Sequence, residues 1–178
     1  DYIIRNATWF RRMNIHYSKT IALLQDAVTH MKPAQLDVCN NADVTVFNSP
    51  YTRSLYPEVT SRVEVIPLGT DFSLFRKMYQ PALRIKHGIQ EKDTVLFVGD
   101  SSDNPKGFPM VLRLIEETNY NFILVMKDGY SSNHPRVKVF NRIPQETLAE
   151  LANCCNAAIC TSVIETQHLS GIEAGACG

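Results

Sequence analysis

The feature that most constrains the fold is the alternation of short apolar segments with segments of helical pattern. The apolar segments are rich in β-branched and aromatic residues and end at turn residues, as strands do. The expected strands are residues 2–4, 20–24, 43–47, 62–66, 94–99, 121–126, 136–140 and 157–160. The expected helices are residues 33–41, 50–56, 109–118 and 144–154. This alternation indicates βαβ units with parallel sheets, so the sequence predicts the α/β class.

The alternation is interrupted once, at residues 67–71, where Pro, Gly and Asp punctuate the chain. Residues 72–88 have no clear period and are expected to be irregular, and the alternating series then resumes. The sequence therefore predicts two partial α/β units, residues 1–68 and residues 69–178. Because the chain starts at Asp1 and stops soon after its last expected helix begins, we expect it to be a fragment of a longer protein.

Composition excludes several classes of function. Lys and Arg together number 18, as do Asp and Glu, and this balance argues against a dedicated nucleic-acid binder. The five cysteines show neither a paired metal-ligand spacing nor an even-numbered disulfide framework, which favours a reducing, cytoplasmic location. No apolar run approaches the roughly 18 residues needed to cross a bilayer.

Two carboxylates near the C-terminal end, Glu165 and Glu173, carry the first chemical signal. Glu165 is expected in the loop after the strand at residues 157–160, and Glu173 in the first turn of the next helix. Ligands of open α/β sheets bind outside the carboxyl ends of the strands, and a helix N-terminus there suits phosphate. The alternative is structural: Ser170 and Glu173 form a capping box, and Glu165 is a solvated acid.

A second signal lies at residues 99–107, which leave a buried strand and enter a helix at the same sheet edge. Gly99 allows the backbone to approach a ligand closely, and Lys106 offers a compact positive charge to a phosphate. The spacing is that of neither a Walker A loop nor a G-x-G-x-x-G loop. An ordinary solvated lysine is the alternative for Lys106.

Three segments in this order resemble retaining glycosyltransferases of the GT-B fold, the family called group 1 or family 4. Residues 165–173 match its E-x7-E motif, and small residues follow as usual. Residues 65–71 resemble its I-P-N-G-V-D crossover, and residues 97–107 resemble its V-G-R…K-G loop. The resemblance implies two partial Rossmann-like parallel-sheet units, with residues 1–68 on the acceptor side and residues 69–178 on the donor side.

The resemblance also implies roles for individual residues. Glu165 would hydrogen-bond the donor sugar, and Lys106 would neutralise the departing diphosphate, where charge builds up in the transition state. Glu173 would bind the ribose. Further donor-binding positions are the backbone amides of Leu169, Ser170 and Gly171, the loop glycine Gly99, and the backbone around Ile143, which would recognise the base.

Two positions depart from the family pattern. Asp100 stands where the family usually has arginine, and a carboxylate would repel a diphosphate unless it points away. Gln25-Asp26 stands where many relatives have His-Asp beside the acceptor, so Asp26 is a less specific acceptor-side candidate.

The expected reaction is transfer of a hexose, with retention, from a nucleotide diphosphate sugar to a glycan, lipid or small-molecule acceptor. The resemblance implies that no metal or other cofactor is needed, and the absence of an Asp-x-Asp in the sequence agrees with this. No nucleic-acid partner is expected. Peripheral association of the parent protein with the cytosolic face of a membrane is compatible with the family. A sugar-nucleotide epimerase and a degenerate nucleotide-sugar-binding module are the alternatives. Because strands of both domains are missing from the family pattern, we expect the 178 residues alone to be inactive.

Overall fold

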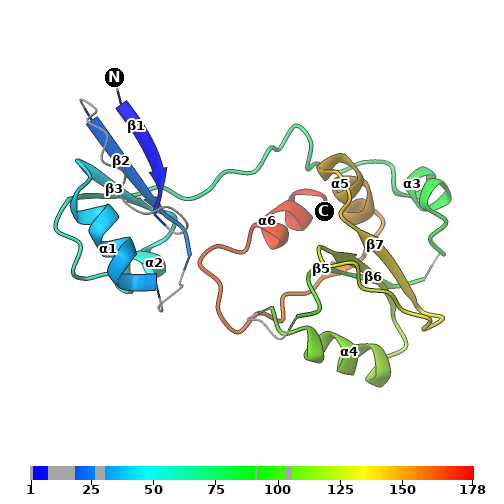
Figure 1. Ribbon diagram of the computed structural model, residues 1–178. Coiled ribbons are helices and arrows are strands. Elements are labelled where there is room, and N and C mark those ends of the chain that lie inside the picture. Colours follow the sequence, from blue (N-terminus) through cyan, green and yellow to red (C-terminus); the bar gives the residue numbers. More distant parts are fainter. Residues whose placement is uncertain (1, 8–18, 27–30, 91, 103–105) are drawn as a thin grey trace. The chain divides into compact units, whose positions relative to one another are not determined.

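A computed structural model describes residues 2–7, 19–26, 31–90, 92–102 and 106–178 (Figure 1). The chain forms two compact units, each with its own four-stranded parallel sheet. The first unit contains Asp1–Gly69 and Glu165–Gln167, and the second contains Thr70–Ile164 and His168–Gly178. The parallel sheets with interleaved helices confirm the predicted α/β class with two Rossmann-like units. The division into residues 1–68 and 69–178 stays a prediction.

The sheet of the first unit has the order β1-β2-β3-β4, with every neighbouring pair parallel. Its strands are β1 (Tyr2–Asn6), β2 (Lys19–Leu24), β3 (Val44–Phe47) and β4 (Arg62–Val65), and its helices are α1 (Lys32–Asn40) and α2 (Pro50–Ser54). Leu24 and Phe47 lie in its core together with Tyr56. Ser49 caps α2 by accepting a hydrogen bond from the Thr52 N–H at 3.1 Å, which fixes the turn that follows β3.

The sheet of the second unit has the order β7-β6-β5-β8, again all parallel. Its strands are β5 (Thr94–Gly99), β6 (Asn121–Met126), β7 (Val137–Asn141) and β8 (Ala157–Ala158). Its helices are α3 (Gln80–His87), α4 (Phe108–Glu117), α5 (Gln145–Asn153) and α6 (Leu169–Ala176).

The strand β6 shows why this sheet is covered on both faces. Ile123 and Val125 belong to one buried cluster, while Phe122, Leu124 and Met126 belong to another. Successive side chains of a strand point to opposite faces, so a continuously apolar strand needs a cover on each face. Residues of α5 and α6 cover the first face, and residues of α4 cover the second.

Two expectations about this unit are wrong. Residues 72–88 are not irregular throughout, because they contain α3, which has a proline in its first turn and ends at Gly88 with φ 60. The hydrophobic pattern of this helix is not recognisable in the sequence, because the apolar Ile85 is exposed and the charged Arg84 is buried. Instead of the expected buried strand at residues 157–160, the structure has the two-residue strand β8, which is exposed and pairs, among the described residues, with β5 alone.

None of the helices in the described part of the chain has both the length and the apolar character needed to cross a bilayer.

Candidate functional site

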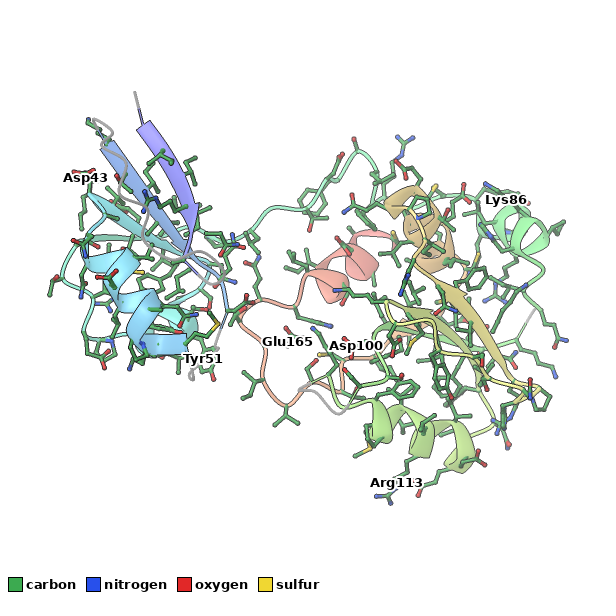
Figure 2. The ribbon with its side chains drawn as sticks, viewed as in Figure 1. Asp43, Tyr51, Lys86, Asp100, Arg113 and Glu165 are labelled. Atoms are coloured by element: carbon green, nitrogen blue, oxygen red, sulfur yellow. The ribbon has the colours of Figure 1, made fainter. Side chains whose placement is uncertain are left out.

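The loop after β5 is fixed to the loop after β6 in the second unit. The Ser101 N–H donates to Asp128 Oδ2 at 2.8 Å, and the Ser101 hydroxyl donates to the same oxygen. These bonds, the hydroxyl's first, hold the pKa of the Asp128 carboxyl below its ordinary value. The neighbouring Asp100 accepts a hydrogen bond from the Ser102 hydroxyl at 2.6 Å (Asp100 is labelled in Figure 2).

The far end of this loop is fixed to the segment after β8. Gly107 has φ 67, and a β-carbon there would lie 2.1 Å from the Thr161 carbonyl oxygen. The Thr161 hydroxyl donates to the Lys106 carbonyl oxygen at 2.7 Å. The end of the loop after β5 therefore meets the segment after β8 at Lys106, Gly107 and Thr161, beyond the carboxyl ends of these neighbouring strands. This is the edge at which ligands bind in open α/β sheets.

The helix α6 begins two residues earlier than a capping box with Ser170 as its N-cap residue requires. His168 is its N-cap residue, and the Ile172 N–H donates to the His168 carbonyl oxygen at 3.2 Å. The Ser170 hydroxyl instead bonds to the His168 ring at 3.1 Å. The expected capping box is therefore wrong, and Glu173 lies beyond the first turn.

The first turn of α6 contains Leu169, Ser170 and Gly171, the residues expected to face a diphosphate. The N–H groups of a first turn have no partner within the helix, so they are available to an anion. A β-carbon at Gly171 would lie 2.3 Å from His168 Nδ1, so the glycine makes room for the imidazole ring.

A cavity of about 300 Å³ lies within the second unit between β8 and α6. The residues lining it include Ala157, Ala158, Cys160, His168 and Gly171. The small side chains of β8 and α6 leave this space open.

Burial of Glu173 raises the pKa of its carboxyl above the ordinary value. Because this pKa is raised in the folded state, ionisation of the carboxyl at neutral pH lowers the free energy of unfolding. The stability that the group contributes is present in acid and lost as pH rises through the folded-state pKa.

We therefore expect Glu173→Gln to raise the midpoint of thermal unfolding at pH 7. The difference from wild type should vanish below the unfolded-state pKa, about 4.3. Thermal scans at pH 7 and pH 3.5 measure this. Glu146→Gln is the control, because Glu146 lies exposed in the first turn of α5 and its loss should lower the midpoint slightly at pH 7. A lower midpoint for Glu173→Gln at pH 7 would contradict the expectation.

Two other predicted donor-binding positions, Gly99 and Ile143, lie next to residues whose packing or backbone bonds the structure shows. A β-carbon at Gly99 would lie 2.6 Å from the end of the Phe97 ring, so the glycine makes room for this buried ring. Beside Ile143, Arg142 has φ 50, a left-handed conformation that is uncommon for residues other than glycine. Its N–H donates to the Met126 carbonyl and its Nε to the Lys127 carbonyl, each at 2.9 Å.

Glu165 belongs to the first unit, whereas Glu173 belongs to the second. The residues after Glu165 bond within the first unit. The Thr166 hydroxyl donates to the Gln25 carbonyl oxygen at 2.7 Å, and the Gln167 side chain bonds to Leu68. Gln25 directly follows β2 and precedes Asp26, the expected acceptor-side residue. The roles expected for Glu165 and Asp26 stay predictions.

Sequence reasoning missed Thr166, Gln167 and Asn48. Asn48 is buried and donates to both Thr166 Oγ1 and the Gln25 carbonyl oxygen at 3.1 Å. An amide side chain directly after an apolar strand was the available signal for Asn48. Nothing local marked its partners, because Thr166 lies 118 residues away.

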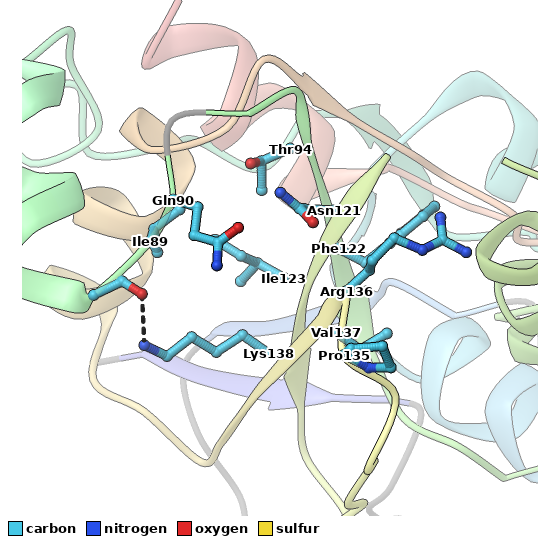
Figure 3. A pocket seen from close by; sticks show the side chains of 11 residues that line it. Ile89, Gln90, Thr94, Asn121, Phe122, Ile123, Pro135, Arg136, Val137 and Lys138 are labelled. Atoms are coloured by element: carbon cyan, nitrogen blue, oxygen red, sulfur yellow. Dashed lines mark hydrogen bonds between the residues drawn. The ribbon is translucent and has the colours of Figure 1, made fainter. Parts of the chain in front are cut away.

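A second pocket, of about 200 Å³, lies at the amino ends of β5, β6 and β7 (Figure 3). Lys138 donates there to the carbonyl oxygens of His87 and Gly88 at the end of α3. Arg136 donates to carbonyl oxygens of Ile115 and Thr118 at the end of α4. Both cations therefore bond to carbonyl oxygens at the C-terminal end of a helix, and this capping role explains why they line the pocket.

Comparison with known proteins shows which solved structures share this fold. No protein-family model matches the sequence, and no curated protein matches it. Among solved structures, sucrose-phosphate synthase from Thermosynechococcus elongatus matches with a TM-score of 0.81 and 19% identity, over 99% of this chain and 54% of that one. HepE from Anabaena, solved in complex with UDP-glucose, matches with a TM-score of 0.69 and 18% identity, over 89% of this chain and 51% of that one.

A glycosyltransferase from Rickettsia africae also matches, with a TM-score of 0.62 and 12% identity, over 89% of this chain and 49% of that one. At these identities the likeness establishes the fold, an α/β arrangement of Rossmann-like units shared with GT-B-like glycosyltransferases. The chain spans about half the length of the solved structures that it matches.

Proposed function

We propose that this chain is part of a glycosyltransferase that transfers a hexose from a nucleotide diphosphate sugar, with retention, to a glycan, lipid or small-molecule acceptor. The observation that carries the proposal is the junction of Lys106 and Gly107 with Thr161 at the carboxyl edge of the second sheet. The likeness of fold to a protein solved with UDP-glucose supports the same class of donor.

The proposed chemistry is stabilisation of the leaving diphosphate. Lys106 would supply a positive charge, and the first-turn N–H groups of α6 would supply oriented dipoles. Charge develops on the leaving phosphate in the transition state, so groups of this kind are worth about a hundredfold each in rate. Glu173 would hold the ribose, and Glu165 the sugar hydroxyls. The proposed transfer uses no metal ion.

Titration of the chain with UDP, followed by calorimetry, tests the donor side. We expect Lys106→Ala and Glu173→Gln each to weaken UDP binding about tenfold, since each removes a charged or charge-assisted contact. Lys86→Ala is the matched control, because Lys86 lies on α3 and pairs with Glu150 at 2.7 Å (Figure 2). UDP affinity that is unchanged in both variants would refute the assignment of this edge.

A further inference from the structure

The five cysteines all lie in the described part of the chain, and they differ in exposure. Cys39, Cys154 and Cys177 are buried, and Cys155 is partly buried. Burial raises the pKa of the Cys154 thiol to about 11 and that of the Cys155 thiol to about 12. The thiolate is the form that reacts, so thiols of this kind are inert. Cys160 is exposed, and an external reagent can therefore reach it.

An imidazole ring lies beside this exposed thiol. The Cys160 sulfur and a ring nitrogen of His168 lie within 4.8 Å of each other, a gap that one intervening water spans. Both residues belong to the second unit, where Cys160 closely follows β8 and His168 is the N-cap residue of α6. The His168 ring also bonds to the Ser170 hydroxyl at 3.1 Å, which fixes its orientation. A proton acceptor is thus held within reach of the thiol.

Cys160 and His168 line the cavity of about 300 Å³ that lies between β8 and α6. Much of the remaining lining is alanine and glycine, so larger side chains do not fill the space beside the sulfur. The cavity reaches Gly171 in the first turn of α6, where the positive end of the helix dipole favours a negative charge. The surroundings of Cys160 therefore suit a small reagent that carries negative charge.

We propose that Cys160 is a modification site that exchanges with small anionic disulfides, with His168 as its proton acceptor. The imidazole takes the thiol proton, and the Cys160 sulfur attacks one sulfur of the disulfide. The S–S bond of the reagent breaks as a new S–S bond to Cys160 forms, and the departing thiolate takes the proton from the imidazolium. The products are a mixed disulfide and one small thiol. Oxidised glutathione belongs to this class of reagent.

The adduct also acts on nucleotide binding, a consequence that rests on the proposed function. A glutathionyl group on Cys160 adds carboxylates to the cavity beside Gly171. The first-turn N–H groups of α6 are the groups proposed to face the diphosphate, and a second anion there competes for them. We expect the modified chain to bind UDP about tenfold more weakly than the unmodified chain, as calorimetry measures it.

The modification is tested on the 178-residue chain with dithiobis(nitrobenzoate), an anionic aromatic disulfide that releases a coloured thiolate. We expect a single rapid phase of release at pH 7, with peptide mapping by mass spectrometry placing the adduct on Cys160. Oxidised glutathione should give the same map. Cys160→Ser should abolish the rapid phase. Cys155→Ser is the matched control, because it changes another thiol that lines the same cavity, and it should retain the phase.

His168→Gln separates the action of the imidazole from simple exposure of the thiol. We expect this variant to react about tenfold or more slowly at pH 7, the effect of losing a positioned proton acceptor. An ordinary thiol ionises near about pH 8.5, so hydroxide replaces the imidazole at pH 9.5, and the two rates should agree there within about twofold. An unfolded variant would expose the buried thiols, and peptide mapping would then find adducts on them as well.

Different outcomes overturn different conclusions. An adduct that maps to other cysteines, or a His168→Gln variant that is as fast as wild type at pH 7, overturns the inference. A UDP affinity that is unchanged by glutathionylation of Cys160 overturns the link between this thiol and nucleotide binding. An unmodified chain that binds no UDP overturns the proposed function, whereas the modification site stands on its own rates and peptide map.

Discussion

Gly107→Ala is expected to destabilise the second unit by about 3 kcal/mol or more, the largest effect predicted for a single methyl group in this chain. Two costs add. The φ of 67 is unfavourable for any residue with a β-carbon, and that carbon would lie 2.1 Å from the Thr161 carbonyl oxygen. The backbone must move, and the Thr161 bond to Lys106 should break with it. Urea denaturation followed by circular dichroism measures the loss.

Gly129→Ala is the matched control for this prediction. Gly129 has φ 81, but a β-carbon there would meet nothing within 4 Å. The control therefore carries the conformational cost alone, about 1–2 kcal/mol. Equal losses in the two variants would show that the contact with Thr161 contributes nothing. UDP affinity should fall in Gly107→Ala and remain unchanged in Gly129→Ala, because only the first moves Lys106.

Arg84→Met is expected to destabilise the second unit by about 3 kcal/mol. Arg84 is 8% exposed, and its guanidinium donates to the carbonyl oxygens of Gln90 and Lys92 and to Asn156 Oδ1. It thereby joins α3 to the start of β5 and to the residue before β8. Methionine fills much of the volume but removes these three bonds, so each acceptor keeps only its bond from the Lys92 N–H or from Thr94. The midpoint of urea denaturation, compared with wild type, measures the change.

Arg113→Met is the control, because Arg113 projects from α4 into solvent (Figure 2). Its side chain is 66% exposed and pairs with Glu117 at 2.8 Å, one turn along the helix. Exposed pairs of this kind contribute about 0.3–0.5 kcal/mol. If Arg84→Met were as mild as Arg113→Met, the buried guanidinium would not be a major link between these elements.

The arginine also shows where sequence reasoning fails. The helix α3 begins with Pro81 in its first turn and ends at Gly88, and both signals stand in the sequence. Its packing, however, depends on a buried cation and leaves Ile85 83% exposed. A hydrophobic period cannot detect such a helix. The capping box failed for a related reason, because the His168 ring competes for the Ser170 hydroxyl and α6 begins earlier.

The sequence by itself determined the α/β class and the parallel sheets. The period of apolar residues along each strand reports burial over a few neighbouring residues, and strands such as β6 express it without ambiguity. The same pattern placed the loop at residues 99–107 and the start of α6 at the carboxyl edge of the second sheet.

Only the tertiary structure decided that Glu165 and Glu173 belong to different units. Gln167 bonds to Leu68, which lies 99 residues away in the sequence, and Thr166 bonds to Gln25, which lies 141 residues away. These bonds form at backbone groups just beyond the carboxyl ends of β2 and β4, and residue spacing does not reveal which of these groups come together. The need for glycine at position 107 arises in the same way, since its neighbour Thr161 comes close only when β5 and β8 pair.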